Sequence, residues 1–130
     1  MSIEIERSID IEDAVRLMLC DIMTVYCRPL PAHFSLPCIL VTQVGGNDVN
    51  KIDTFEVVLD ARAETEAVAL EYLRNAIGIL KARSKIQSSA IRYVSVNSSG
   101  SWGTDPARPD IAMCSARLNI IAHLENTTIS

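Results

Sequence analysis

The sharpest pattern in the sequence is IAMCSARLNIIAHL, residues 111–124, in which apolar and more polar side chains largely alternate. A period of two is typical of a β-strand that buries one face and leaves the other partly exposed. The apolar face would carry Ala112, Cys114, Ala116, Leu118, Ile120, Ala122 and Leu124. We therefore expect this strand to lie in a sheet that helices cover on one face.

Three further strands are predicted upstream. Residues 38–44 form a run of mostly apolar and β-branched side chains that a pair of glycines ends, and residues 54–62 alternate cleanly. We expect these two strands to pair as a hairpin with a long, mobile tip over residues 45–52. The other strand is predicted over residues 90–96, before a polar loop.

Two helices are predicted over residues 10–26 and 66–83, with Asp10 and Thr65 as N-caps. The core stripe of the first helix would be Ile11, Val15, Met18, Ile22 and Tyr26, and that of the second Ala69, Leu73, Ala76, Ile77 and Leu80. The order of elements is helix, strand, strand, helix, strand, strand. It predicts an α+β fold, in which an antiparallel sheet of about four strands carries two main helices packed on one face.

Length and composition limit the classes of function. The 130 residues fit a single domain, 1–130, in which residues 1–8 and 125–130 are expected to be flexible ends. A net charge of −4, without a strong basic cluster, argues against free nucleic acid as the main ligand. No apolar run is long enough to span a membrane and the first residues are acidic, so we expect a protein of the cytosol.

The residues that could carry chemistry are few. The four cysteines lack CxxC spacing, so we expect free thiols. Cys27, His33 and Cys38 could be three zinc ligands, but no fourth follows at a supporting distance. Cys27 and His33 could also be the nucleophile and base of a small enzyme, an alternative that we keep. The favoured interpretation is a protein without catalytic activity, cofactor or metal.

The single tryptophan, Trp102, lies in the polar loop predicted over residues 97–109, which is rich in Ser, Gly and Pro. It either folds back onto its own domain or is covered by another chain. Because tryptophan is enriched at the centres of protein interfaces, we favour the second interpretation. Arg108 is a candidate for a salt bridge to Asp48 or Asp60 of a neighbouring subunit, with a solvated arginine as the alternative.

Several segments together resemble a known family. They are LPCILVTQVGG at residues 36–46, the acidic Asp53, the helical AVALEYL at residues 67–73, PARPD at residues 106–110 and Arg117 in the closing strand. This pattern covers some two-thirds of the chain and is similar to the small tail terminator, or tail completion, proteins of tailed phages. Phage head–tail joining proteins of similar size share much of it.

The resemblance implies a structural virion protein without cofactor or reaction. Tail terminators of this kind form a hexameric ring that caps the tail tube, stops its polymerisation and provides the docking surface for the head. The implied partners are copies of the chain, the tail tube protein and the head–tail connector protein. The genome DNA would pass through the ring without specific binding. The protein would lie in the host cytoplasm during assembly and then at the head-proximal end of the virion tail.

The contacts of such a ring are expected in the two predicted loops. The candidate interface residues are Gly45, Gly46, Asn47, Asp48, Trp102 and Arg108. Arg117, on the more polar face of its strand, is expected to be paired within the sheet. The nearest alternative function is a joining protein on the head side of the same junction. A small Cys/His enzyme and a monomeric adaptor are less favoured.

Overall fold

A computed structural model describes residues 1–49, 52–86 and 89–130. The chain forms an α+β fold with two helices, a mixed five-stranded sheet and a separate two-stranded sheet, and 52% of the chain is strand. The elements in chain order are β1 (Ile3–Arg7), α1 (Ile11–Leu19), β2 (Val25–Cys27), β3 (Cys38–Val49), β4 (Ile52–Ala63), α2 (Glu66–Arg83), β5 (Ile91–Asp105), β6 (Arg108–His123) and β7 (Glu125–Ile129).

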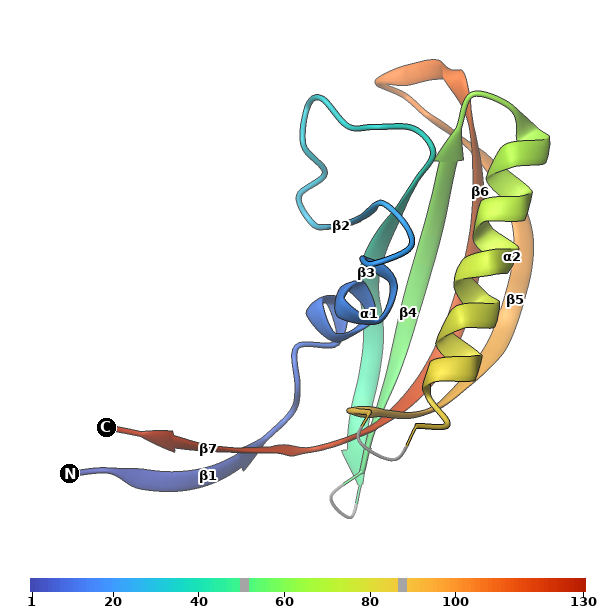
Figure 1. Cartoon of the computed structure of the whole chain (residues 1–130). Helices are drawn as coiled ribbons and strands as arrows, with labels where there is room; N and C mark the ends of the chain where they lie inside the picture. Colours follow the sequence, from blue (N-terminus) through green and yellow to red (C-terminus); the bar gives the residue numbers. More distant parts are fainter. Residues whose placement is uncertain (50–51, 87–88) are drawn as a thin grey trace.

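The large sheet has the strand order β2-β3-β4-β6-β5 (Figure 1). Its four long strands are the predicted ones, and each pairs antiparallel with its neighbour. The prediction of a purely antiparallel four-stranded sheet is wrong at one edge, where β2 pairs parallel with β3. Two of the three residues of β2, Val25 and Tyr26, were predicted as the end of the first helix. That helix ends at Leu19 instead, and the chain then turns back along β3.

One apolar core joins both helices to one face of the sheet. The buried residues of α2 are the predicted ones: Ala69, Leu73, Ala76, Ile77 and Leu80. Ile11, Val15 and Leu19 are the buried residues of α1, whereas the predicted Ile22 lies beyond the helix and is exposed. Asp10 and Thr65 are the N-caps, as predicted, because each accepts a hydrogen bond from the backbone N–H three residues later.

Most of the described residues of both predicted loops are strand in the structure, and residues 50–51 of the first loop lie outside the described residues. Strand β3 continues to Val49, and β5 continues through the Ser- and Gly-rich stretch to Asp105, which pairs with Arg108 of β6. The low strand propensity of these residues did not predict the extension, because the neighbouring strand supplies hydrogen-bond partners for their backbone N–H and C=O groups. The β5–β6 register is interrupted at four places, one of which is at Gly100.

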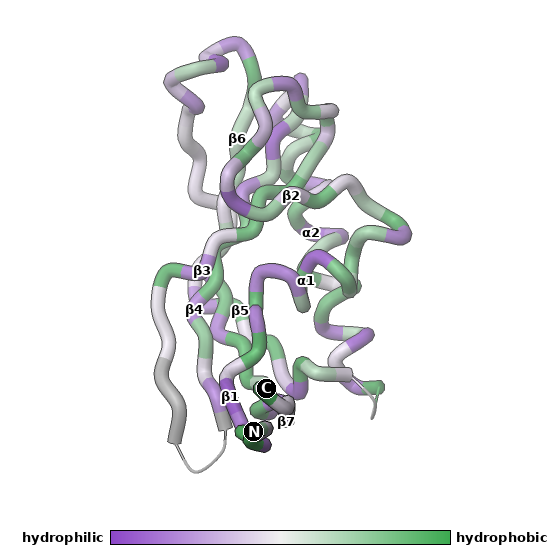
Figure 2. Tube along the Cα trace, turned by 90° about the vertical axis from the view of Figure 1, so that its left-hand side faces the viewer, coloured by the Kyte–Doolittle hydropathy of each residue, from purple (hydrophilic) through white to green (hydrophobic). Residues whose placement is uncertain are grey.

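The predicted flexible ends pair with each other. Strands β1 and β7 form a two-stranded antiparallel ribbon, and Arg7 Nε donates to Glu125 Oε1 at 2.7 Å. The ribbon projects from the body, at the end of the molecule away from the turn between β5 and β6 (Figures 1 and 2). Neither helix of the described chain is long and apolar enough to cross a bilayer.

Candidate functional site

Trp102 lies on β5, opposite Cys114 of β6, and 48% of its surface is exposed. It therefore neither enters the core nor stands fully in water. A groove of about 490 Å³ runs past it, and the groove walls include Glu64, Glu66 and Met113. Glu66 is the first residue of α2 and Glu64 lies just before its N-cap, so segments distant in the sequence form the groove. A half-exposed aromatic ring in an acidic groove is suited to contact with a partner that carries positive charge.

Arg108 is the first residue of β6, directly after the turn from β5. Its guanidinium donates to both carboxylate oxygens of Asp110, each at 3.1 Å, and lies 5.9 Å from the ring centre of Phe34. The hydrogen bond from Arg108 lowers the pKa of Asp110 below its ordinary value. The predicted bridge from Arg108 to a neighbouring subunit stays a prediction, and within the chain its partner is Asp110.

The other candidate interface residues lie far from Trp102. Gly45 and Gly46 are in β3, where Gly46 lies opposite Phe55 of β4. Trp102 pairs with Cys114 of β6, and Cys114 in turn pairs with Ala61 of β4. Ala61 is six residues from Phe55, which is about 20 Å at the rise of a strand. The predicted interface residues are therefore divided between two ends of the sheet.

Gly46, among the candidate residues on β3, has a backbone conformation and a close neighbour that require glycine. Gly46 has φ +152°, and a Cβ there would lie 2.5 Å from the carbonyl oxygen of Thr54, so no larger residue fits without movement. The backbones of Asn47 and Asp48 continue β3, whereas their side chains lie outside the described part of the structure. Their predicted contacts therefore remain predictions.

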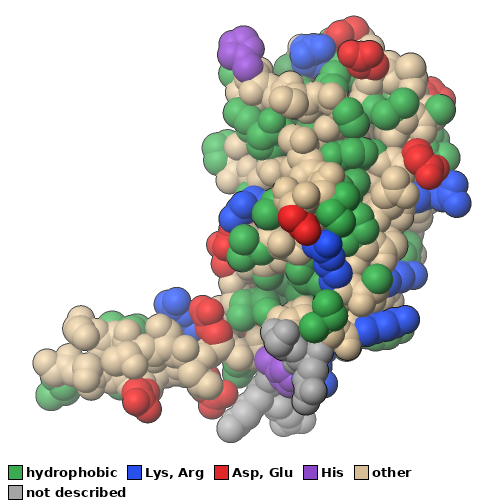
Figure 3. Space-filling model, in the orientation of Figure 1, with side chains coloured by type: hydrophobic (Ala, Val, Ile, Leu, Met, Phe, Trp, Pro, Cys, Tyr) green, Lys and Arg blue, Asp and Glu red, His purple; other side chains and the backbone are tan. Residues whose placement is uncertain are grey.

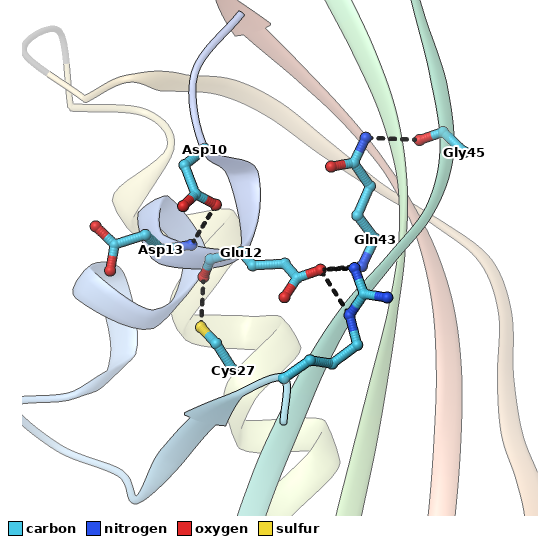
Figure 4. Close-up of polar contacts among 7 residues, drawn as sticks. Asp10, Glu12, Asp13, Cys27, Gln43 and Gly45 are labelled. Atoms are coloured by element: carbon cyan, nitrogen blue, oxygen red, sulfur yellow. Dashed lines mark hydrogen bonds and ion pairs between the residues drawn. The ribbon is translucent and has the colours of Figure 1, made fainter. Parts of the chain in front are cut away.

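A carboxylate from α1 organises the β3 edge next to Gly45 (Figure 4). Glu12 accepts hydrogen bonds from Arg28, at 2.5 Å to Nη2, and from the backbone N–H of Gln43, at 3.0 Å. The side chain of Gln43 in turn donates to the carbonyl of Gly45 at 3.5 Å. Burial alone would raise the pKa of Glu12, but the hydrogen bonds from Arg28 and Gln43 lower it overall. Gln43 lies two residues beyond the segment of β3 that pairs with β2, so Glu12 satisfies an edge N–H that β2 does not reach.

Burial raises the pKa of three of the four cysteine thiols, those of Cys27, Cys38 and Cys114. The thiol of Cys27 donates to the backbone carbonyl of Glu12 at 3.3 Å, and burial raises its pKa. Cys38 is fully buried in β3, which raises its pKa to about 11, so its thiolate form is scarce at neutral pH. All four cysteines are free, and no cluster of three or more His, Cys, Asp or Glu side chains that could hold a metal occurs among the described residues.

Two buried polar side chains were not singled out from the sequence as buried groups. Arg62 on β4 pairs with Asp105 at 3.4 Å, and its Nη1 has no hydrogen-bond partner among the described residues. Asp53 is 2% exposed, and its carboxylate oxygens are likewise without a partner in the described chain. Both positions sit in the alternating pattern of β4, but their burial depends on segments that come later in the chain.

Comparison with models of known protein families and with curated protein sequences found no match for this chain.

Proposed function

We propose that the chain is a structural virion protein of the phage tail terminator type, which forms a ring, expected to be a hexamer, on the end of the tail tube. In this role its copies contact one another, stop the addition of tube subunits and present the surface to which the connector of a filled head docks. DNA passes through the opening without specific binding, and no reaction, cofactor or membrane takes part. The protein acts in the host cytoplasm during assembly and then at the head-proximal end of the tail.

The observation that carries this proposal is the exposure of Trp102. A large aromatic ring that its own subunit leaves 48% exposed is suited to a partner that covers it. Tyr93 and Val96 on the same strand are also exposed large apolar side chains. Strand β5 therefore combines three such residues along one edge of the sheet, which favours a protein surface as its partner over a small molecule.

The sheet edges give the proposal a second support. Among the described strands, β5 pairs only with β6, and β2 covers only Ile39–Val41 of the long strand β3. Two stretches of edge backbone, on opposite sides of the sheet, are thus left without a strand partner. Closed rings need contacts in which one side of a subunit meets a different side of the next, and two unlike edges suit such contacts.

The substitution Trp102→Ala tests the proposal. We expect the free energy of unfolding of the isolated chain to change by no more than about 1 kcal/mol, because the indole side chain is half-exposed. We expect the variant to lose assembly into the oligomeric ring. Mass by light scattering and negative-stain images measure assembly, and denaturant unfolding measures stability. Leu17→Ala is the matched control, since Leu17 is an exposed apolar residue on α1, away from β5. If Trp102→Ala unfolds the chain, or leaves rings intact, Trp102 is not the interface anchor.

The phage phenotype separates the terminator from its nearest alternative. Loss of a terminator should give overlong tails beside DNA-filled heads, because tube growth is no longer stopped. Normal tails that never attach to heads would assign the chain to the head side of the junction instead. An activity that Cys27→Ala abolishes without disturbing assembly would favour an enzyme over both.

A further inference from the structure

The N-terminal end of α2 is acidic and unpaired. Glu64 and Glu66 are exposed, and neither has an ion-pair partner among the described residues. They face the same groove as the exposed ring of Trp102. The helix dipole alone makes negative charge favourable at the N-terminus of α2. It gives no reason for Trp102, which belongs to β5, to line the same groove. The acidic groove therefore combines charge and apolar surface from two separate elements.

The C-terminal end of α2 has the opposite character. Lys81 and Lys85 are exposed and have no acidic partner in the described part of the chain. Together with Arg92 and Tyr93 of β5 they line a second hollow, of about 240 Å³. Arg92 contacts the ring of His123 and adds positive charge to this end. Figure 3 shows Lys and Arg side chains over the lower part of α2. We call the hollow with Lys81 and Lys85 the basic end.

The two ends cannot meet within one subunit. Helix α2 has 18 residues, which at 1.5 Å per residue separates its ends by about 27 Å. At this distance, charges exposed to solvent are largely screened at physiological ionic strength. The acidic groove and the basic end can therefore neutralise each other only between two molecules.

We propose that the acidic groove of one copy of the chain, with Trp102 at its wall, receives the basic end of the next copy. Glu64 and Glu66 pair with Lys81 and Lys85 of the neighbour, and one of these ammonium groups lies over the face of the indole ring. The occupant is a second copy because this chain itself carries the complementary charges on an exposed, differently placed surface. This inference rests on the proposed ring function and adds to the sheet edges a contact along α2 and β5.

The contact has a direction. One patch meets a different patch, so every subunit still offers a free groove at one side and a free basic end at the other. Such a head-to-tail contact repeats until the ring closes. A pair of identical patches would stop at a dimer instead.

Charge reversal at each end tests the contact. The variants are Glu64→Lys with Glu66→Lys, Lys81→Glu with Lys85→Glu, and the fourfold combination of both pairs in one chain. We expect each double variant alone to need a roughly tenfold or higher concentration for half-assembly, measured by light scattering. The fourfold variant should assemble again, because both ends are reversed together. An equimolar mixture of the two double variants should also assemble.

The control exchanges charges in the middle of the same helix. Glu71 and Arg74 pair with each other at 3.3 Å, so Glu71→Arg with Arg74→Glu changes α2 without touching either end and should leave assembly unchanged. Assembly of the wild-type chain should also weaken as salt rises, in parallel with the fourfold variant.

The outcomes separate the inference from the proposed function. Rings that persist in both double variants overturn the inference and leave the ring function standing. A fourfold variant that stays monomeric while it remains folded by circular dichroism also overturns the inference. A wild-type chain that stays monomeric at every concentration and salt, alone and with isolated tail tubes, overturns both.

Discussion

Strands β4 and β6 pair along almost their whole length, yet their two faces differ in chemistry. On the helix-covered face, Leu59 and Leu118 are fully buried. On the other face, Glu56 accepts a hydrogen bond from Arg117 at 3.2 Å, as expected for an arginine paired within the sheet, and both side chains are more than 40% exposed. The two faces of the same pair of strands therefore differ: one is buried in the apolar core, and the other carries charged side chains that are partly exposed to solvent. Substitutions on the two faces should differ strongly in their effect on stability.

The largest effect is expected on the covered face. Leu118→Ala removes a fully buried side chain between α2 and the neighbouring strands, and leaves a cavity that the helices can fill only in part. We expect a loss of about 3–5 kcal/mol in the free energy of unfolding, measured by urea denaturation. A loss below about 1 kcal/mol would mean that the helices do not cover this face tightly.

Arg62 is the exception on the open face and should give the next largest effect. Its side chain is 9% exposed, and its ion-pair partner Asp105 is 13% exposed. Asp105→Asn leaves a buried guanidinium without a compensating charge, so we expect a loss of about 2–3 kcal/mol. The amide can still accept the hydrogen bond from the backbone N–H of Ala107. The double variant Arg62→Met with Asp105→Asn is the control, and it should recover most of the loss.

Glu12 should give a smaller effect that depends on pH. Its pKa is lowered in the folded chain, so its contribution to stability is fully present above the ordinary glutamate pKa of about 4.3. The contribution disappears as pH falls through the lowered value. Glu12→Gln should therefore cost about 1 kcal/mol at pH 7, because Arg28 is half-exposed and the pair is partly screened. Urea denaturation at pH 7 and pH 3 should show the difference from wild type shrinking at the lower pH; a constant difference would contradict it.

The smallest effect is expected for the exposed pair on the open face. Arg117→Ala removes the contact with Glu56, and we expect a change below about 0.5 kcal/mol in the free energy of unfolding. The measurement is the same urea denaturation as for Leu118→Ala on the same strand. A loss comparable with that of Leu118→Ala would show that the open face is buried in the state being measured.

The difference between the two faces was largely predictable from the sequence, whereas the functional surface was predictable only in part. The alternation in β6 assigns Leu118 and Arg117 to opposite faces, and the structure agrees. Trp102 stood out because it is the single tryptophan in a polar stretch. Its acidic neighbours Glu64 and Glu66 could not be assigned to it, because nothing local connects the start of α2 with the end of β5.

The sequence by itself determined those features that depend on neighbours a few residues away. These are the strand period of β6, the caps Asp10 and Thr65 and the buried stripe of α2. The tertiary structure decided features that need groups from distant segments. Arg83 of α2 donates to the carbonyl of Met18 at 2.8 Å, satisfying a group at the C-terminal end of α1, and pairs with Asp21 just beyond it.

The extension of β5 through its Ser- and Gly-rich stretch likewise depends on β6. Its residues have weak strand propensity and acquire order only because β6 supplies the backbone partners. The physical reason is common to both cases. A hydrogen bond to a distant segment forms only when the chain has already folded, so no local pattern of residues records it.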